Sequence, residues 1–312
     1  LIPALIRLKA GQTERDDGPE SHLSKTGTPT MGGIMMLAAI LITCIVLTAG
    51  NAEFVITALL VTFAYGLIGF LDDYIKVVKK RSLGLRAMQK IVAQVGFAVV
   101  LAIYAYKSPL IGSELYVPFL KDYVDFGWFY IPLVVFAVLA TTNSVNLTDG
   151  LDGLASGVTV VVMAVVGLLI NFTVLTLAEA GSSMQLTENL RNLMMFSATV
   201  VGACIGFLYY NHYPAKVFMG DTGSMALGAA FVVATVLSKT LLIVPIVGFM
   251  FMVSSISDII QVASYKLRNK KRVFLMAPLH HHFEKKGYSE VQIVTAYVLI
   301  TIALGALCFV IV

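Results

Sequence analysis

Long apolar runs, separated by short polar links, dominate the chain. Nine runs approach the roughly 20 residues that an α-helix needs to cross the hydrocarbon core of a bilayer. They cover residues 31–49, 54–71, 91–106, 128–142, 158–177, 193–210, 224–237, 240–262 and 291–311. The runs at 128–142 and 224–237 are short for a lipid-exposed helix, so we expect each to be partly buried or to extend into flanking polar residues. The pattern predicts an all-α, polytopic bundle of transmembrane helices.

Composition supports this class. Of the 312 residues, 58% are hydrophobic and 13% are charged, and the mean hydropathy is +0.86, which lies outside the balance of a soluble domain. The links are short and no internal repeat is apparent, so we expect one integral-membrane domain over residues 1–312. Cys44, Cys204 and Cys308 lie in apolar runs without metal-binding spacing, and we interpret them as small core residues.

Basic residues are distributed unevenly between alternate links. Eighteen of the 22 Lys and Arg residues lie in residues 1–30, 72–90, 263–290 and at Lys216. The opposite links hold only Lys107, Lys121, Arg191 and Lys239. Because Lys and Arg are enriched in cytoplasmic loops, the first set is predicted to be cytoplasmic and the C-terminus to lie outside. A basic face of this kind suits anionic head groups or anionic substrates, and it makes nucleic acid a poor alternative.

Two adjacent carboxylates, Asp72 and Asp73, follow the predicted span 54–71. Neighbouring side chains on a helix diverge by about 100°, so the two acids are expected to have different roles, whereas Asp72 and Lys76 share a face. Taken alone, this motif is more typical of a solvated charge cluster at the end of a helix.

The link that follows span 128–142 carries Asn146, Asp149 and Asp152, which recur every three residues. If this backbone is helical, the three side chains line one stripe, and Gly150 and Gly153 allow close approach of a ligand or helix. The alternative is that Asn, Asp and Gly simply form turns. The absence of a nearby basic residue weakens that alternative.

Asp221 stands just before the predicted span 224–237. Its carboxylate could supply a hard oxygen ligand to Mg²⁺, beside backbone N–H groups that favour phosphate at a helix N-terminus. The alternative is that Asp221 is an ordinary N-terminal cap.

The last link contains three consecutive histidines, His280, His281 and His282. Zinc sites space their ligands so that they converge on one ion, whereas consecutive side chains diverge, so zinc is not expected. Imidazoles beside Lys285 and Lys286 are suited to hydrogen bonds with phosphate or sugar oxygens. A solvated basic loop is the alternative.

Four links on one predicted membrane face thus present groups that bind a diphosphate and a metal, which favours an enzyme. With these motifs the chain closely resembles the phospho-N-acetylmuramoyl-pentapeptide transferases, within the polyprenyl-phosphate N-acetylhexosamine-1-phosphate transferases. The landmarks follow the family order over essentially the whole chain: Lys25–Gly33 (KTGTPTMGG), Phe70–Lys76 (FLDDYIK), Asn146–Leu154 (NLTDGLDGL), Phe218–Ser224 (FMGDTGS) and Pro278–Gly287 (PLHHHFEKKG). The last of these resembles the muramoyl-pentapeptide branch in particular.

The resemblance implies a reaction and a location. Phospho-N-acetylmuramoyl-pentapeptide would pass from its UDP donor to undecaprenyl phosphate, releasing UMP and forming the first lipid-linked intermediate of peptidoglycan synthesis. Magnesium would be the cofactor, and the site would face the cytoplasm from the bacterial inner membrane. The resemblance also implies a homodimer, roles in cell shape and division, and ten transmembrane helices. Since nine runs are visible, we expect the tenth helix before Leu1. The apolar segment 1–8 is not a recognisable signal peptide.

Site residues are carried over on the same basis. The acids and imidazoles tied to catalysis are Asp72, Asp73, Asp221, His280, His281 and His282, with Asp221 also on magnesium. The substrate-binding set is Lys25, Lys76, Asn146, Asp149, Asp152, Asn211 and Phe218. Within this set, Lys25, Asp152, Asn211 and Phe218 form the uridine end, where the aromatic ring stacks on uracil.

Two alternatives remain at this stage. A sister transferase that uses UDP-N-acetylglucosamine shares the aspartates, so a substrate assay separates the two. An ion-coupled transporter also places acids in a multi-span domain, but transporters bind near the midplane with broken helices, whereas these acids stand at the ends of spans.

Overall fold

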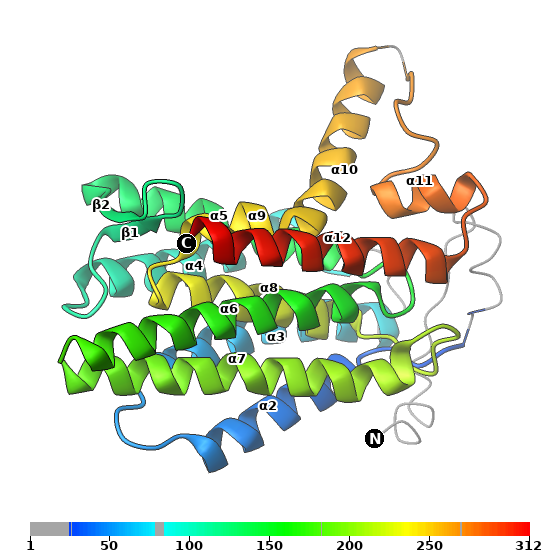
Figure 1. The fold of residues 1–312 in the computed structure, drawn as a ribbon. Coiled ribbons are helices and arrows are strands. Elements are labelled where there is room, and N and C mark those ends of the chain that lie inside the picture. Colours follow the sequence, from blue (N-terminus) through cyan, green and yellow to red (C-terminus); the bar gives the residue numbers. More distant parts are fainter. Residues whose placement is uncertain (1–24, 26, 79–83, 182, 269) are drawn as a thin grey trace.

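The computed structural model describes residues 25, 27–78, 84–181, 183–268 and 270–312, and this part of the chain is a bundle of helices with one small hairpin (Figure 1). The described elements are α2 (Gly33–Leu47), α3 (Glu53–Val78), α4 (Ala87–Lys107), β1 (Glu114–Val117), β2 (Asp122–Asp125), the 3₁₀ turn η2 (Gly127–Phe129), α5 (Tyr130–Thr148), α6 (Leu154–Glu179), α7 (Met184–Asn211), α8 (Gly220–Leu237), the 3₁₀ turn η3 (Leu241–Ile243), α9 (Val244–Val247), α10 (Phe249–Leu267), α11 (Leu279–Lys285) and α12 (Glu290–Ile311).

Each predicted apolar run coincides with a helix or a pair of helices, which confirms a polytopic helical membrane protein. Among the described residues, seven helices are long and apolar enough to cross a membrane, and a bent pair makes up to eight. The remaining apolar helix, α2, has only 15 residues, so the count of nine spans stays a prediction. The expected tenth span lies outside the described residues.

The two short runs behave differently. The run predicted at 128–142 extends into flanking residues and becomes a helix over Gly127–Thr148. In contrast, α8 has only 18 residues and is surrounded by α2, α3, α5, α6 and α7, so that every residue from Thr222 to Leu237 is buried. A helix shielded from lipid in this way need not match the full thickness of the bilayer.

The run predicted as one span over 240–262 is broken. Its two parts, Leu241–Val247 and Phe249–Leu267, meet at an angle of 76° at Gly248. A Cβ at Gly248 would lie 2.7 Å from the Val244 carbonyl oxygen and 2.9 Å from the Phe231 ring, so only glycine fits this corner. Beyond the bend, α10 points away from the other helices, and the short helix α11 packs against α10 and α12 (Figure 1).

Close helix contacts hold α8 beside α2 and α3. A Cβ at Gly33 in α2 would collide with the backbone of Gly223 in α8, and a Cβ at Gly69 in α3 would collide with the backbone of Asp221. Small residues at such crossings let helix backbones approach in a membrane protein, where packing drives association. The end of α3 and the beginning of α8 are therefore held together at one end of the bundle.

Candidate functional site

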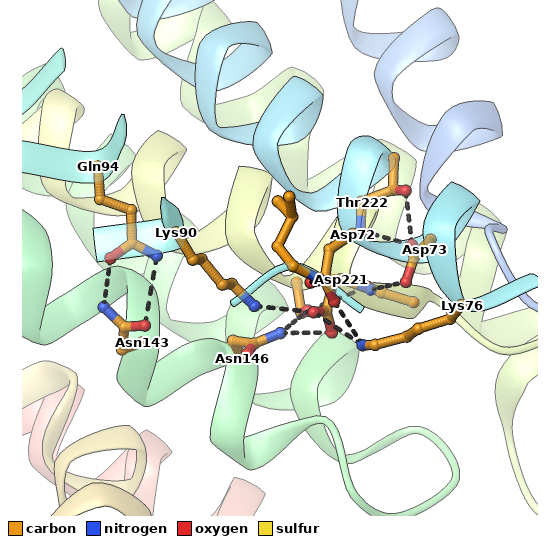
Figure 2. A network of polar contacts seen from close by, with 12 residues as sticks. Asp72, Asp73, Lys76, Lys90, Gln94, Asn143, Asn146, Asp221 and Thr222 are labelled. Atoms are coloured by element: carbon orange, nitrogen blue, oxygen red, sulfur yellow. Dashed lines mark hydrogen bonds and ion pairs between the residues drawn. The ribbon is translucent and has the colours of Figure 1, made fainter. Parts of the chain in front are cut away.

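Three carboxylates meet where α3 ends and α8 begins. Asp72, Asp73 and Asp221 each offer one oxygen, and these oxygens lie within 4.8 Å of one another (Figure 2). Asp72 and Asp73 are buried, and the Asp221 side chain is 17% exposed. The structure thus brings together the three acids that the sequence placed in two separate motifs.

Asp73 caps the N-terminus of α8. Its Oδ1 accepts a hydrogen bond from the Asp221 N–H at 3.1 Å, and its Oδ2 accepts from the Thr222 N–H at 2.9 Å and the Thr222 hydroxyl at 2.7 Å. The first N–H groups of a helix lack partners within the helix and favour a negative charge. The alternative that Asp221 caps its own helix is wrong, because α8 has no side-chain cap of its own and Asp73 supplies these contacts from α3.

Asp72 faces the other way, as expected for adjacent helical side chains. Its Oδ1 accepts from the Leu85 N–H at 2.7 Å, and its Oδ2 pairs with Lys76 Nζ at 2.6 Å. The predicted pairing of Asp72 and Lys76 on one helix face is confirmed. Gly84, which has a positive φ of 57°, lies against the Asp72 carboxylate, so the residues just before α4 cover this acid.

Two ammonium groups and one amide converge on Asp221. Lys76 Nζ lies 3.1 Å and Lys90 Nζ 2.8 Å from Oδ2, while Asn146 Nδ2 donates to Oδ1 at 3.0 Å (Figure 2). From the sequence, Lys90 is only one of the basic residues of the link 72–90, because the residues around it do not show which acid it contacts. Three carboxylates facing two lysines form a cluster of hard oxygen donors, which is the donor set that Mg²⁺ prefers.

A pair of amides fixes Lys90 and Asn146 relative to each other. Gln94 on α4 donates to Asn143 on α5 at 3.3 Å, and Asn143 donates back to Gln94 at 2.8 Å (Figure 2). Lys90 lies one turn before Gln94 and Asn146 lies three residues after Asn143. This bridge therefore aligns two helices so that both side chains reach Asp221.

The link between α5 and α6 is a turn and not a helix. α5 ends at Thr148, and Gly153 precedes α6 with a positive φ of 79°. The single stripe required a helical link, so it does not form and the alternative of a turn is confirmed: Asn146 faces Asp221, whereas Asp152 faces Lys25. Asp149 lies between them, and its burial, followed by the charges of Asp221, Asp73 and Asp152, raises the pKa of its carboxyl to about 8.

A second ionic cluster joins residues that are far apart in the sequence. Lys25 Nζ lies 2.8 Å from Asp152 Oδ1 and 2.7 Å from Glu290 Oε1. Burial opposes the charge on Lys25, but hydrogen bonds with Asp152 and Glu290 outweigh it and raise the pKa of this amine. The sequence did not predict a role for Glu290, because this residue borders the predicted span 291–311 and belongs to none of the motifs.

The remaining residues of the predicted uridine end lie around this cluster. Asn211 Oδ1 accepts from the Gly153 N–H at 3.1 Å, and Asn211 Nδ2 donates to the Val217 carbonyl at 2.9 Å. The Asp152 carboxylate accepts from the Ala215 N–H at 2.9 Å. Phe218 is half-buried, and its N–H donates to the Pro29 carbonyl at 2.8 Å. Four segments therefore enclose this side of the site.

The three histidines lie on the helix α11, where the sequence pattern predicted a loop. His280 and His281 both present Nε2 to Gly150, whereas His282 faces Leu275. His280 is fully buried against Gly150 and Tyr297. His281 Nδ1 contacts the Glu284 carboxylate at 2.8 Å, and His282 Nδ1 accepts from the Leu275 N–H at 3.0 Å. The expected divergence therefore holds for His282 but not for His280 and His281, whose ring centroids lie 4.3 Å apart.

The surroundings of His282 favour its neutral form. Its burial, followed by the charge of Lys286, lowers the pKa of the imidazole. Because Nδ1 accepts from a backbone N–H, the proton of the neutral ring stays on Nε2. His280 and His281 instead connect α11 to the turn at Gly150, beside Asp149 and so beside the carboxylate cluster.

Comparisons with known proteins agree with this arrangement. A family model described as glycosyl transferase family 4 matches residues 55–239. The chain is 46% identical over 304 residues to the phospho-N-acetylmuramoyl-pentapeptide-transferase of Clostridioides difficile (strain 630), covering 97% of this chain and 89% of that protein. The protein of the same name from Thermoanaerobacter sp. (strain X514) is 46% identical over 310 residues, or 99% and 92% of the two chains. That from Acetivibrio thermocellus is 46% identical over 311 residues, or 99% and 89%.

Proposed function

Because the chain belongs to the phospho-N-acetylmuramoyl-pentapeptide transferase family, we propose that it transfers phospho-N-acetylmuramoyl-pentapeptide from its UDP donor to undecaprenyl phosphate, releasing UMP. The family makes it a multi-pass membrane protein and a glycosyl-1-phosphate transferase of peptidoglycan synthesis. The identity of the donor, the lipid acceptor and the cofactor are parts of the proposal.

The observation that carries the proposal is the cluster of three carboxylates and two lysines. In the reaction an oxygen of the lipid phosphate attacks the sugar-linked phosphorus, a new P–O bond forms, and the P–O bond to UMP breaks. Both reactants are anions, so the protein must neutralise charge and align them. Lys76 and Lys90 are placed to do so, since each already contacts Asp221 and neither is fully buried.

The carboxylates fit a divalent cation by their donor chemistry. Asp221 is the residue that would hold Mg²⁺, and Asp72 and Asp73 each offer a further oxygen within 4.8 Å. Bound Mg²⁺ would supply positive charge to the diphosphate during transfer. Asp73 would then act by fixing the position of Asp221, and Asn146 by orienting one Asp221 oxygen.

The geometry favours Asp72 as a positioning group over a general base. The second pKa of a phosphate monoester is about 6, so the lipid phosphate is already largely dianionic at neutral pH. The Asp72 oxygens are occupied by the Leu85 N–H and Lys76. A pH–rate profile of Asp72→Asn separates the two roles, since activity rescued at high pH supports a base.

The cluster around Lys25 is proposed to hold the uridine end of the donor. Lys25, Asp152 and Asn211 lie together, and the half-buried Phe218 ring is suited to stack on uracil. His280 and His281 contact the turn at Gly150, which lies between Asp149 and Asp152 in the sequence. They are suited to donate hydrogen bonds to phosphate or sugar oxygens.

We place the site on the cytoplasmic face of the bacterial inner membrane. The links that bear it carry most of the basic residues of the chain, as cytoplasmic loops do. A donor that carries a diphosphate and a peptide cannot cross the bilayer, so a site that faces its source is required.

The test is UMP release by purified protein given UDP-N-acetylmuramoyl-pentapeptide and undecaprenyl phosphate, with and without Mg²⁺. Turnover of this donor that requires Mg²⁺ is expected. UDP-N-acetylglucosamine serves as the second donor in a parallel assay. Turnover of that donor alone would assign the chain to the sister activity, and no turnover of either would refute the proposal.

Asp221→Asn tests the metal site. The amide keeps the shape of the side chain but removes the charge, so magnesium-dependent turnover is expected to fall by at least about 100-fold. The thermal stability of the variant should change little, since the α8 cap comes from Asp73. Activity near that of the wild type at ordinary magnesium would exclude this role.

A further inference from the structure

We propose that Glu290 is a positioning residue for the nucleotide donor, and that it acts by holding Lys25 and the turn at Asp152 in the geometry that binds the uridine end of the donor. This inference rests on the proposed function, because it presumes a UDP-linked donor. It adds a residue outside the motifs that identify the family in this sequence.

The contacts of Glu290 join two parts of the site at once. One oxygen lies 2.7 Å from Lys25 Nζ, and Oε2 accepts from the Asp152 N–H at 3.2 Å. The Glu290 side chain is only 7% exposed and the Lys25 side chain 12%. Charge-assisted hydrogen bonds shielded from water are stronger than exposed ion pairs and fix geometry more firmly.

The pairing determines where the Lys25 ammonium group points. An ammonium group has three N–H donors, and in the described part of the chain Asp152 and Glu290 accept from two of them. Holding two donors fixes the direction of the third, which then points toward an oxygen of the uridine end of the donor. Without Glu290, Lys25 would pair with Asp152 alone and could rotate about that contact.

The position of Glu290 in the fold makes it a firm anchor. It is the first residue of α12, where a negative charge is favourable. The preceding Ser289 and Gln292 form a capping box, in which Ser289 Oγ accepts from the Gln292 N–H and Gln292 accepts from the Ser289 N–H. The histidine helix α11 ends at Lys285, only a few residues before Glu290. Glu290 therefore links the Lys25 cluster to the helix that carries the histidines.

The experiment is calorimetric titration of the full-length protein with UDP, together with steady-state kinetics. Glu290→Gln keeps the size of the side chain and an acceptor for the Asp152 N–H but removes the negative charge that faces the Lys25 ammonium group. We expect the affinity for UDP to fall about tenfold and the KM for the donor to rise in parallel. The KM for undecaprenyl phosphate and kcat at saturating donor should stay within about threefold of the wild type.

A double-mutant cycle distinguishes positioning from a general structural effect. If Glu290 acts through Lys25, Glu290→Gln should add little once Lys25→Met has removed the ammonium group. Glu53→Gln is the matched control, because Glu53 is also the first residue of a helix and accepts a hydrogen bond, here from the Tyr104 hydroxyl at 2.7 Å. It should bind UDP as the wild type does.

The outcomes are distinguishable. Wild-type protein that does not bind UDP would overturn the proposed function and this inference together. Wild-type binding with unchanged affinity in Glu290→Gln, or additive losses in the cycle, would overturn the inference alone. If Glu290→Gln does not fold, Glu290→Asp carries the test: its shorter side chain cannot reach both partners, so an intermediate loss is expected and wild-type affinity would contradict the proposal.

Discussion

Asp221 is the residue at which the contacts of the site converge. Its side chain meets lysines from α3 and α4 and an amide from α5, while its backbone N–H is bound by Asp73. A residue held by four partners from three helices, three of them on its carboxylate, has little freedom to move. Removing any partner should therefore change how Asp221 presents its oxygens, even where the substituted residue does not touch substrate.

Lys90 gives the sharpest test at this scale. Lys90→Met removes the ammonium group that lies 2.8 Å from Asp221, and kcat/KM is expected to fall by about 100-fold. Lys90→Arg retains the charge and should recover part of the activity. Lys239→Met is the control, because Lys239 pairs with Glu114 near the β-hairpin at 3.4 Å. If Lys90→Met and the control had equal activities, Lys90 would have no part in the reaction.

The raised pKa of Asp149 predicts that the stability of the protein depends on pH. Its pKa of about 8 in the folded protein lies above the value near 3.9 of an unfolded chain, so between these values the folded state binds more protons. The free energy of unfolding is therefore lowered by Asp149 as pH rises from about 4 through about 8, and it levels off above that.

The measurement is thermal unfolding in detergent without Mg²⁺, from pH 6 to pH 9. Asp149→Asn cannot ionise, so the wild type should lose stability relative to the variant up to about pH 8 and then run parallel to it. Parallel curves over the whole range would show that Asp149 does not titrate in this way.

At the scale of elements, the site depends on how closely α3 approaches α8. Gly69 has no side chain to keep the helices apart, and it faces the backbone of Asp221 itself. The distance between these two helices sets the positions of Asp72 and Asp73 relative to Asp221. Helix packing and site geometry are thus one property of this protein.

Gly69→Ala should therefore harm both stability and activity. The added methyl group overpacks the crossing, at a cost of about 1–3 kcal/mol, and it displaces the first turn of α8. We expect activity to fall at least about tenfold, because small displacements of reacting groups are costly. Gly96→Ala in α4 is the control, since a Cβ there meets nothing within 4 Å. The test is to measure the unfolding temperature and the rate of UMP release for both variants. Equal values for Gly69→Ala and Gly96→Ala would refute a role of the α3–α8 crossing in the site.

At the scale of the whole molecule, the links that carry the site should all face one side of the membrane. Lys121 lies in the β1–β2 hairpin and Lys270 follows α10, and both are exposed with positive φ values of 51° and 65°. The distribution of basic residues predicts that Lys270 is cytoplasmic and Lys121 is not. The native cysteines are buried, so a single introduced cysteine can report on each position.

Labelling with a membrane-impermeant maleimide tests this orientation. Lys121→Cys should react from outside intact cells, whereas Lys270→Cys should react only in inverted membrane vesicles. The reverse pattern would place the carboxylate cluster on the outer face and would contradict the proposed source of the donor.

The sequence alone determined what depends on neighbouring residues. The length and apolarity of each run gave the helical membrane class, because a bilayer requires about 20 such residues and satisfied backbone hydrogen bonds. Helical periodicity predicted that Asp72 and Lys76 share a helix face, but it did not predict that His280 and His281 converge on Gly150. The family motifs identified the main site residues, whose roles are predictions.

Only the tertiary structure decided which distant residues meet. Asp73 caps a helix that begins near Thr222, 149 residues away, Lys90 reaches Asp221 across 131 residues, and Glu290 reaches Lys25 across 265. The bend at Gly248 and the turn after Thr148 also interrupt runs whose local pattern allowed a continuous helix. Such contacts depend on how the helices pack, and packing is set by many side chains from several helices at once, so no local pattern contains it.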